Sequence, residues 1–248
     1  TKMNVSVLAN TLIGSEIIKI GNEVNEMKRK GAQIANLTIG DFDPSIFPIP
    51  TELKEEIVSA YNQGHTNYPP ADGILPLRET IVDVLADRYQ LTYATTDILV
   101  AGGSRPLIYA TYLALVDPGD KVIYPAPSWN NNHYCHLSSA NGVAVETTVE
   151  NNFMPTASQL KPHLKGATLL ALCSPLNPTG TMFTKEQLEE ICDIVIEENK
   201  SRGVDEKPLY IMYDQIYSLL TFDKDHVNPV SLRPELRDYT IYIDGISK

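Results

Sequence analysis

The stretch Leu209–Tyr217, LYIMYDQIY, decides the fold, because a short apolar run ends there at a carboxylate. Such a run predicts a strand that is buried on both faces, as in a parallel sheet covered by helices. A carboxylate at its end, Asp214, is costly to bury unless it pairs with a cation. Two hypotheses stay open: Asp214 and Tyr217 both face a bound cationic ligand, or Asp214 caps a helix and Tyr217 only packs.

Further elements of the same kind flank this stretch on both sides. The expected strands are residues 35–39, 98–100, 121–124, 143–149, 167–173, 209–213 and 240–243. The expected helices are residues 12–30, 51–63 with Thr51 as N-cap, 75–89, 106–116, 129–140, 158–164 and 184–202. Strands that alternate with helices predict an α/β fold, a three-layer sandwich with a mainly parallel central sheet. In such sheets, ligands bind beyond the carboxyl ends of the strands.

The composition narrows the class of protein. The chain has 248 residues, 43% of them hydrophobic, which is enough to bury a core. Its net charge of -11 argues against nucleic acid and anionic membranes as partners. No apolar stretch approaches the ~18 residues of a membrane span, and the N-terminus lacks the pattern of a signal peptide. Cys135, Cys173 and Cys192 lack metal-ligand spacing, so we expect no metal site and a reduced, cytoplasmic protein.

A glycine-rich turn, Ala101-Gly102-Gly103-Ser104-Arg105, lies between an expected strand and an expected helix. Glycines permit a sharp turn, and the free N–H groups at a helix start can hold a phosphate, to which Arg105 would add positive charge. The alternative is an ordinary turn between a strand and a helix.

A rigid loop, Ser174–Gly180 (SPLNPTG), follows the expected strand that ends at Cys173. Two prolines and a glycine restrict its backbone and hold Asn177 at the edge of the sheet. A fixed amide donor suits a phenol or phenolate oxygen. The alternative is an Asx turn that merely ends the strand.

A lysine, Lys248, follows the last expected strand in Asp244-Gly245-Ile246-Ser247-Lys248. Desolvation at the end of a buried strand would lower the pKa of its amine and free it to attack a carbonyl. The alternative is a surface lysine at a chain end.

Together, at successive strand ends, these segments resemble the fold-type I pyridoxal-phosphate (PLP) enzymes of the class I/II aminotransferase family. Ile98–Pro127, with its Pro-Gly-Asp turn, and Thr66-Asn67-Tyr68 add to the likeness, which covers nearly the whole chain. The resemblance implies the PLP-transferase fold, an aminotransferase activity and PLP as cofactor.

The resemblance also implies catalytic roles. Lys248 would form the Schiff base with PLP and then move the substrate's Cα proton. Asp214 would keep the pyridine nitrogen protonated. Asn177 and Tyr217 would hydrogen-bond the 3′ oxygen of the ring.

Further binding roles follow from the same resemblance. Gly103, Ser104 and Arg105 would hold the cofactor phosphate, with Tyr68 contributed across the interface of a homodimer. Trp129, in Pro127-Ser128-Trp129, would stack on the ring; the alternative is a tryptophan of the core.

The resemblance also implies where the substrate binds. Gly40 would approach the substrate carboxylate, and Trp129 and Asn177 would also contact substrate.

The chain departs from the family pattern in three ways. Gly245 replaces the serine that often binds phosphate three residues before the lysine, and Gln215 replaces the usual glutamate after Asp214. Family members continue beyond the lysine with a substrate-clamping arginine and a C-terminal small domain, so we expect a truncated chain. Residues 1–45 would belong to the small domain, and residues 46–248 to an incomplete PLP-binding domain.

The expected reaction is amino-group transfer between an L-amino acid and a 2-oxo acid. The stretch Pro127–His133 resembles the Trp–Asn–His run of aspartate aminotransferases, with one extra residue, and favours aspartate with 2-oxoglutarate. One alternative is a PLP-dependent lyase or decarboxylase on the same scaffold. Another is a non-catalytic sensor domain of a transcription regulator, which would need an attached DNA-binding domain.

Overall fold

The computed structural model describes residues 4–38, 40 and 43–248. The contacts within the chain divide it into two compact units, Thr1–Pro70 and Ala71–Lys248. The expected boundary at residues 45 and 46, which concerns the domains of a complete enzyme, stays a prediction.

The first unit contains helices α1 (Val7–Thr11), α2 (Glu16–Arg29) and α3 (Thr51–Asn62). The helix expected over 12–30 is therefore confirmed from Glu16 onward. The N-cap prediction for Thr51 is wrong: Thr51 is the first helical residue, Pro50 precedes it, and the described residues offer no side chain that caps α3.

The strand expected over 35–39 does not form in residues 35–38, and Ile39 lies outside the described residues. The side chain of Asn36 accepts hydrogen bonds from the backbone N–H and the hydroxyl of Thr38, at 3.1 and 2.6 Å. Such a local bond competes with strand pairing and explains the wrong prediction.

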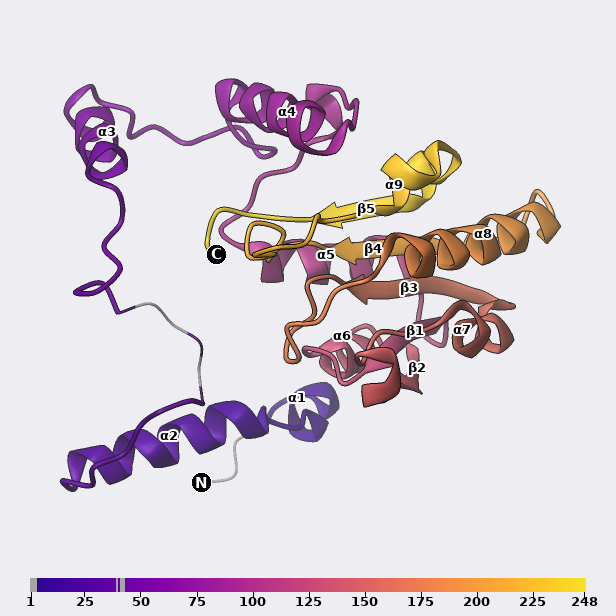
Figure 1. Ribbon diagram of the computed structural model, residues 1–248, viewed down its shortest axis with the longest axis horizontal. Coiled ribbons are helices and arrows are strands. Elements are labelled where there is room, and N and C mark those ends of the chain that lie inside the picture. The colour runs from indigo at the N-terminus through magenta and orange to yellow at the C-terminus, as the bar shows by residue number, and fades with distance from the viewer. Residues whose placement is uncertain (1–3, 39, 41–42) are drawn as a thin grey trace. The chain divides into compact units, whose positions relative to one another are not determined.

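The second unit is an α/β sandwich built on a five-stranded sheet, and it is described throughout (Figure 1). Its strands are β1 (Lys121–Ala126), β2 (Asn141–Glu146), β3 (Ala167–Cys173), β4 (Tyr210–Asp214) and β5 (Thr240–Ile243). They are parallel and lie in the order β2-β1-β3-β4-β5. The expected α/β fold with a mainly parallel central sheet is confirmed.

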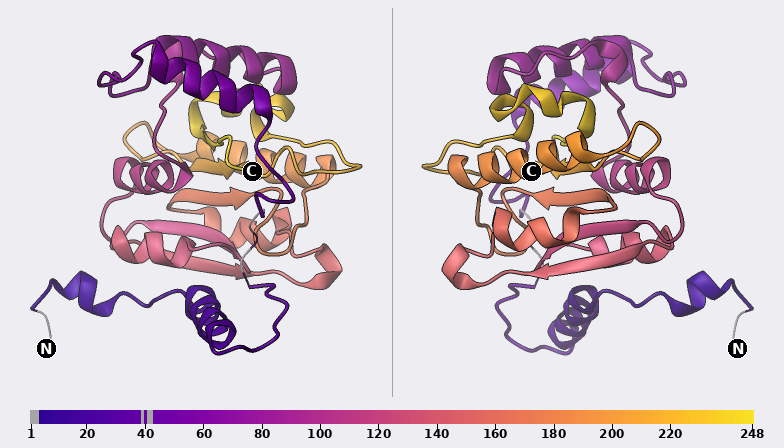
Figure 2. Two further views of the ribbon diagram at one scale, coloured as in Figure 1. Left: turned by 90° about the vertical axis from the view of Figure 1, so that its left-hand side faces the viewer. Right: turned by 90° about the vertical axis from the view of Figure 1, so that its right-hand side faces the viewer.

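Helices cover both faces of this sheet (Figure 2). The helices of this unit are α4 (Leu75–Tyr89), α5 (Ser104–Leu115), α6 (Asn131–Leu137), α7 (Ala157–Leu164), α8 (Lys185–Ser201) and α9 (Pro229–Leu232). Alternate residues of β3 enter different cores: Leu170 and Leu172 pack with α7 and α8, whereas Leu169 and Ala171 pack with α5 and α6. This double burial is why β3 is apolar at every position except Thr168.

Two expected elements of the second unit differ from the structure. Residues 98–100 are not a strand; Val100 N–H donates to the carbonyl of Asp72 at 3.1 Å, and no ladder in the described chain includes this segment. The helix expected from Trp129 begins only at Asn131, because Asn130 has a left-handed backbone with φ of 60°.

Two further boundaries shift. The helix expected from Pro106 begins two residues earlier, at Ser104. The strand expected over 143–149 lies at Asn141–Glu146, and Thr147, directly after it, still donates through its N–H to the carbonyl of Ala126 in β1 at 2.9 Å.

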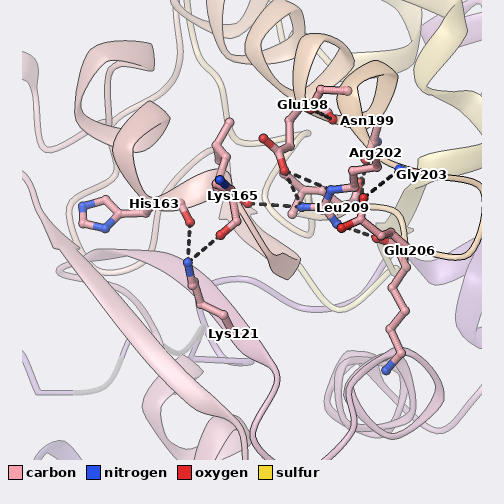
Figure 3. A network of polar contacts seen from close by, with 12 residues as sticks. Lys121, His163, Lys165, Glu198, Asn199, Arg202, Gly203, Glu206 and Leu209 are labelled. Carbon is pink, nitrogen blue, oxygen red and sulfur yellow. Dashed lines mark hydrogen bonds and ion pairs between the residues drawn. The ribbon is translucent and has the colours of Figure 1, made fainter.

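A polar network ties the sheet together at the amino ends of its strands (Figure 3). Lys121, the first residue of β1, donates through Nζ to the carbonyls of His163 and Lys165 at 3.2 and 2.7 Å. Arg202, directly after α8, donates to the Glu198 carboxylate at 3.0 Å. These contacts stabilise the amino edge of the sheet, and the candidate site lies at the opposite edge.

Candidate active site

The expected site residues of the second unit follow the carboxyl ends of neighbouring strands. Trp129 follows β1, Asn177 follows β3, Tyr217 follows β4 and Lys248 follows β5. Because all these strands are parallel, their carboxyl ends share one edge of the sheet. The register pairs Cys173 with Asp214 and Asp214 with Ile243, so the last three loops start side by side.

Asn177, Tyr217 and Lys248 come together at this edge. Asn177 Nδ2 donates to the phenol oxygen of Tyr217 at 3.2 Å. Lys248 Nζ lies 5.9 Å from the centroid of the Tyr217 ring. An amide, a phenol and an amine therefore face one another, although 71 positions separate Asn177 from Lys248 (248 − 177).

Asp214 lies beside this group as a desolvated carboxylate. Burial raises the pKa of Asp214 to about 6, a backbone hydrogen bond from Ile216 N–H opposes the rise, and the Asp244 carboxylate adds to it. In residues 4–38, 40 and 43–248, no ion pair compensates Asp214. No helix begins at Asp214, since only turns follow it. The structure therefore favours the hypothesis that Asp214 faces a bound cationic ligand over the hypothesis that it caps a helix.

Cys173, in register with Asp214, supplies no such cation. Burial raises the pKa of its thiol well above the usual range, and the Asp214 carboxylate raises it further. The thiol is therefore neutral, and its Sγ contacts the carbonyl oxygen of Pro175 at 3.2 Å.

The start of α5 has the properties of an anion site. Gly103 precedes the helix with φ of 114°, a conformation that favours glycine, and no side chain in the described part of the chain caps the first turn. Ser104 and Arg105 are the first two helical residues, where N–H groups lack acceptors within the helix. The expected phosphate contacts stay predictions that this geometry supports.

Tyr134 links the two ends of the site electrostatically, and sequence patterns did not single it out. Burial raises the pKa of this phenol, the positive charge of Arg105 lowers it and the Asp214 carboxylate raises it. Arg105 and Asp214 therefore both act on this one ring, from α5 and β4.

A buried asparagine holds the loop that carries Trp129. Asn131 accepts a hydrogen bond from the fully buried Tyr112 hydroxyl at 3.0 Å, and its amide donates to Ser128 Oγ at 3.3 Å. The loop containing the half-buried Trp129 is thereby anchored to α5. Sequence reasoning had no signal for this role, because Asn131 lies in a run of three asparagines.

Two expected site residues, Gly40 and Tyr68, belong to the first unit. The Tyr68 side chain is 103% exposed relative to the reference value, so it is free for contacts outside its unit. A side chain at Gly40 would meet no atom of the described chain within 4 Å. The roles expected for both residues stay predictions.

A sequence profile described as "Aminotransferase class I and II" matches residues 32–248. The chain belongs to this family. The expected resemblance to this family is thereby confirmed, and the family's cofactor is pyridoxal phosphate.

Aspartate and alanine aminotransferases are among the most similar known proteins. An aspartate aminotransferase from Bacillus sp. (strain YM-2) is 31% identical over 248 residues, which cover 98% of this chain and 60% of the relative. The structure of Thermus thermophilus aspartate aminotransferase with maleate has a TM-score of 0.88 and 26% identity, covering 99% of this chain and 61% of that one. Alanine aminotransferase from Pyrococcus furiosus has a TM-score of 0.86 and 26% identity, covering 99% and 60%. The chain thus spans about three fifths of the length of these relatives.

The site residues fit pyridoxal phosphate. Asp214 pairs with no cation of the described residues, a protonated pyridine nitrogen would provide one, and the amide and phenol of Asn177 and Tyr217 lie beside it. Lys248 supplies an amine that can attack the aldehyde carbon of PLP. The first turn of α5 supplies N–H groups that can bind the phosphate of PLP.

The described residues contain no group of three or more His, Cys, Asp or Glu side chains placed to hold one metal ion. None of the helices seen in residues 4–38, 40 and 43–248 combines the length and apolarity that crossing a membrane requires.

Proposed function

We propose that the protein containing this chain is a PLP-dependent aminotransferase that moves an amino group between an L-amino acid and a 2-oxo acid. One observation carries the proposal: Asp214 is a desolvated carboxylate that no cation of the described residues pairs with, beside the cluster of Asn177, Tyr217 and Lys248. A protonated pyridine ring with a phenolic oxygen and an aldehyde satisfies all four groups at once.

Each residue of the site has a defined task in this reaction. When bound, PLP supplies an electron-withdrawing ring that stabilises negative charge on the substrate's Cα. Asp214 holds a proton on the ring nitrogen. Asn177 and Tyr217 orient the ring through its oxygen, and the first turn of α5 binds the phosphate. Lys248 Nζ would take the proton from the substrate's Cα and deliver it to the former aldehyde carbon, on the other side of the amino nitrogen.

Aspartate and 2-oxoglutarate are the proposed substrates. The run Trp129–His133 resembles that of aspartate aminotransferases, and one similar structure holds maleate, a four-carbon dicarboxylate like aspartate. Alanine aminotransferase from Pyrococcus furiosus has an almost equal TM-score, so the fold alone does not select between these amino acids.

The experiment uses the full-length protein, loaded with PLP and mixed with one amino acid at a time. Conversion of the cofactor to its amino form, followed by its visible absorbance, is expected with aspartate and to a smaller extent with alanine. The proposal is refuted if no amino acid produces this conversion. Release of ammonia or CO2 without an added 2-oxo acid would instead establish a lyase or decarboxylase.

A homodimer is part of the proposal, with Tyr68 of each subunit reaching the phosphate of the other. The full exposure of Tyr68 supports this role. Tyr68→Phe is expected to weaken PLP binding without changing the molar mass in solution. An unchanged affinity for PLP would remove Tyr68 from the phosphate site.

A further inference from the structure

Gln215 lies between two polar side chains at the edge of the sheet that carries the site. Its side chain is fully buried. Its Nε2 donates to Oδ2 of Asp244 at 2.8 Å, and its Oε1 lies 3.1 Å from Nε2 of His226. The contact with Asp244 fixes the orientation of this amide, because reversing it would place the amide oxygen against a carboxylate oxygen, and neither can donate.

His226 is fixed by the same contact. Because Gln215 Oε1 can only accept, His226 Nε2 must carry a hydrogen, so that the neutral ring has its free lone pair on Nδ1. That Nδ1 is buried and has no hydrogen-bond partner in the described chain. Burial lowers the pKa of His226 to about 4, and the rings of Tyr89 and Tyr213 lie 5.6 and 6.0 Å away. The ring is therefore neutral at physiological pH.

On its other side, Gln215 contacts the start of the segment that carries the lysine. Its backbone N–H donates to the carbonyl of Ile243 at 2.9 Å, next to the side-chain bond to Asp244. The second oxygen of Asp244 accepts from Gly245 N–H at 2.7 Å. A Cβ atom added at Gly245 would lie 3.0 Å from Cδ1 of Ile216, so the two loops are in close contact.

We infer that Gln215 is a positioning residue that holds the segment Asp244–Lys248 through a matched pair of a neutral amide at 215 and a carboxylate at 244. The inference rests on the proposed function of Lys248. Glutamate, the usual residue of the family at this position, would place a second carboxylate within hydrogen-bond distance of Asp244. An exchange of the two groups, with glutamate at 215 and asparagine at 244, would restore both the hydrogen bond and the charge.

The test compares Gln215→Glu with the double variant Gln215→Glu/Asp244→Asn in the full-length protein. We expect Gln215→Glu to weaken PLP binding about tenfold, because like charges meet at the base of the lysine segment. It should also raise the pH at which the lysine-bound cofactor changes colour, since added negative charge favours its protonated form. The dissociation constant of the double variant for PLP should lie within about threefold of that of the unchanged protein. Its lysine-bound cofactor should change colour at nearly the same pH as in the unchanged protein.

The state of His226 gives a readout that does not involve PLP. In the cofactor-free protein, nuclear magnetic resonance should show the pKa of His226 rising by about 1 pH unit or more in both variants, because a carboxylate at position 215 faces its Nε2 in each. This rise verifies that the new carboxylate occupies the place of the amide. No rise in either variant would overturn the contact between residues 215 and 226.

Gln187→Glu is the matched control, because it introduces the same change at the exposed cap of α8, where the side-chain oxygen still accepts from Thr184 N–H. It should leave PLP affinity and the colour change unaltered.

Two results would overturn the matched pair. The first is that Gln215→Glu binds PLP as tightly as the unchanged protein. The second is that the double variant does not fold or does not recover the PLP affinity of the unchanged protein. Failure of the unchanged protein to form a lysine-bound cofactor would instead refute the proposed function, which the His226 titration does not involve.

Discussion

Replacing Asp214 by asparagine should stabilise the cofactor-free protein, and the gain should grow with pH. Asparagine keeps an oxygen that can accept from Ile216 N–H and removes the desolvated charge. Burial raises the pKa of Asp214 from 3.8 to about 6. Each unit of difference corresponds to about 1.4 kcal/mol, so the ionised carboxylate costs about 3 kcal/mol of folding free energy at pH 8.

The sign follows from proton binding. Between the unfolded and the folded pKa, the folded state binds more protons than the unfolded state, so stability falls as pH rises through this window. With these two pKa values, the cost is about 1.6 kcal/mol at pH 5 and about 3 kcal/mol at pH 8. The advantage of Asp214→Asn over the unchanged protein should therefore increase by about 1.4 kcal/mol between pH 5 and pH 8.

Urea unfolding of both proteins at the two pH values measures this difference, because pH effects common to both proteins cancel. Asp193→Asn is a control of opposite sign, since the Arg233 guanidinium lowers the pKa of Asp193 through a hydrogen bond. Added PLP should reverse the order and stabilise the unchanged protein more than Asp214→Asn. An equal advantage at pH 5 and pH 8 would refute the desolvated charge at Asp214.

Three further outcomes are expected. Tyr217→Phe removes the oxygen that accepts from Asn177, so the dissociation constant for PLP should rise about three- to tenfold in an absorbance titration. Borohydride reduction and peptide mapping of the loaded full-length protein should place the cofactor on Lys248, and modification of another residue would contradict the assignment. Arg202→Met leaves the half-buried Glu198 without its partner, so it should cost up to about 3 kcal/mol in urea unfolding, whereas PLP affinity should stay unchanged.

The sequence predicts an element well where local and tertiary preferences agree. Residues 167–173 form a strand with the expected bounds, because both faces of the sheet bury apolar side chains there. Residues 98–100 have the same apolar character but lack a ladder partner in the described chain, and composition carries no information about pairing. The backbone of Asn130, left-handed in the structure, likewise leaves no sign in hydrophobic spacing.

The site divides in the same way. Asn177, Tyr217 and Lys248 could be grouped from the sequence, because parallel strands bring consecutive strand ends to one edge. The contacts of Gln215 could not, since they join residues 29 and 11 positions away through single hydrogen bonds. Hydrophobic periodicity predicts which face of a helix or strand a residue occupies. It does not predict which polar group the side chain contacts there.

The two carboxylates at the ends of β4 and β5 argue for a cationic ring nitrogen. Burial raises the pKa of both Asp214 and Asp244, and Gln215 satisfies Asp244 without adding positive charge. One cation at Asp214 would therefore offset both. A PLP analogue with carbon in place of the ring nitrogen should bind the protein more weakly than PLP at pH 8, where Asp214 is ionised. At pH 5, Asp214 is about 90% protonated before binding, so the preference for PLP should shrink about tenfold. Equal preference at both pH values in competition titrations would show that Asp214 does not face the ring nitrogen.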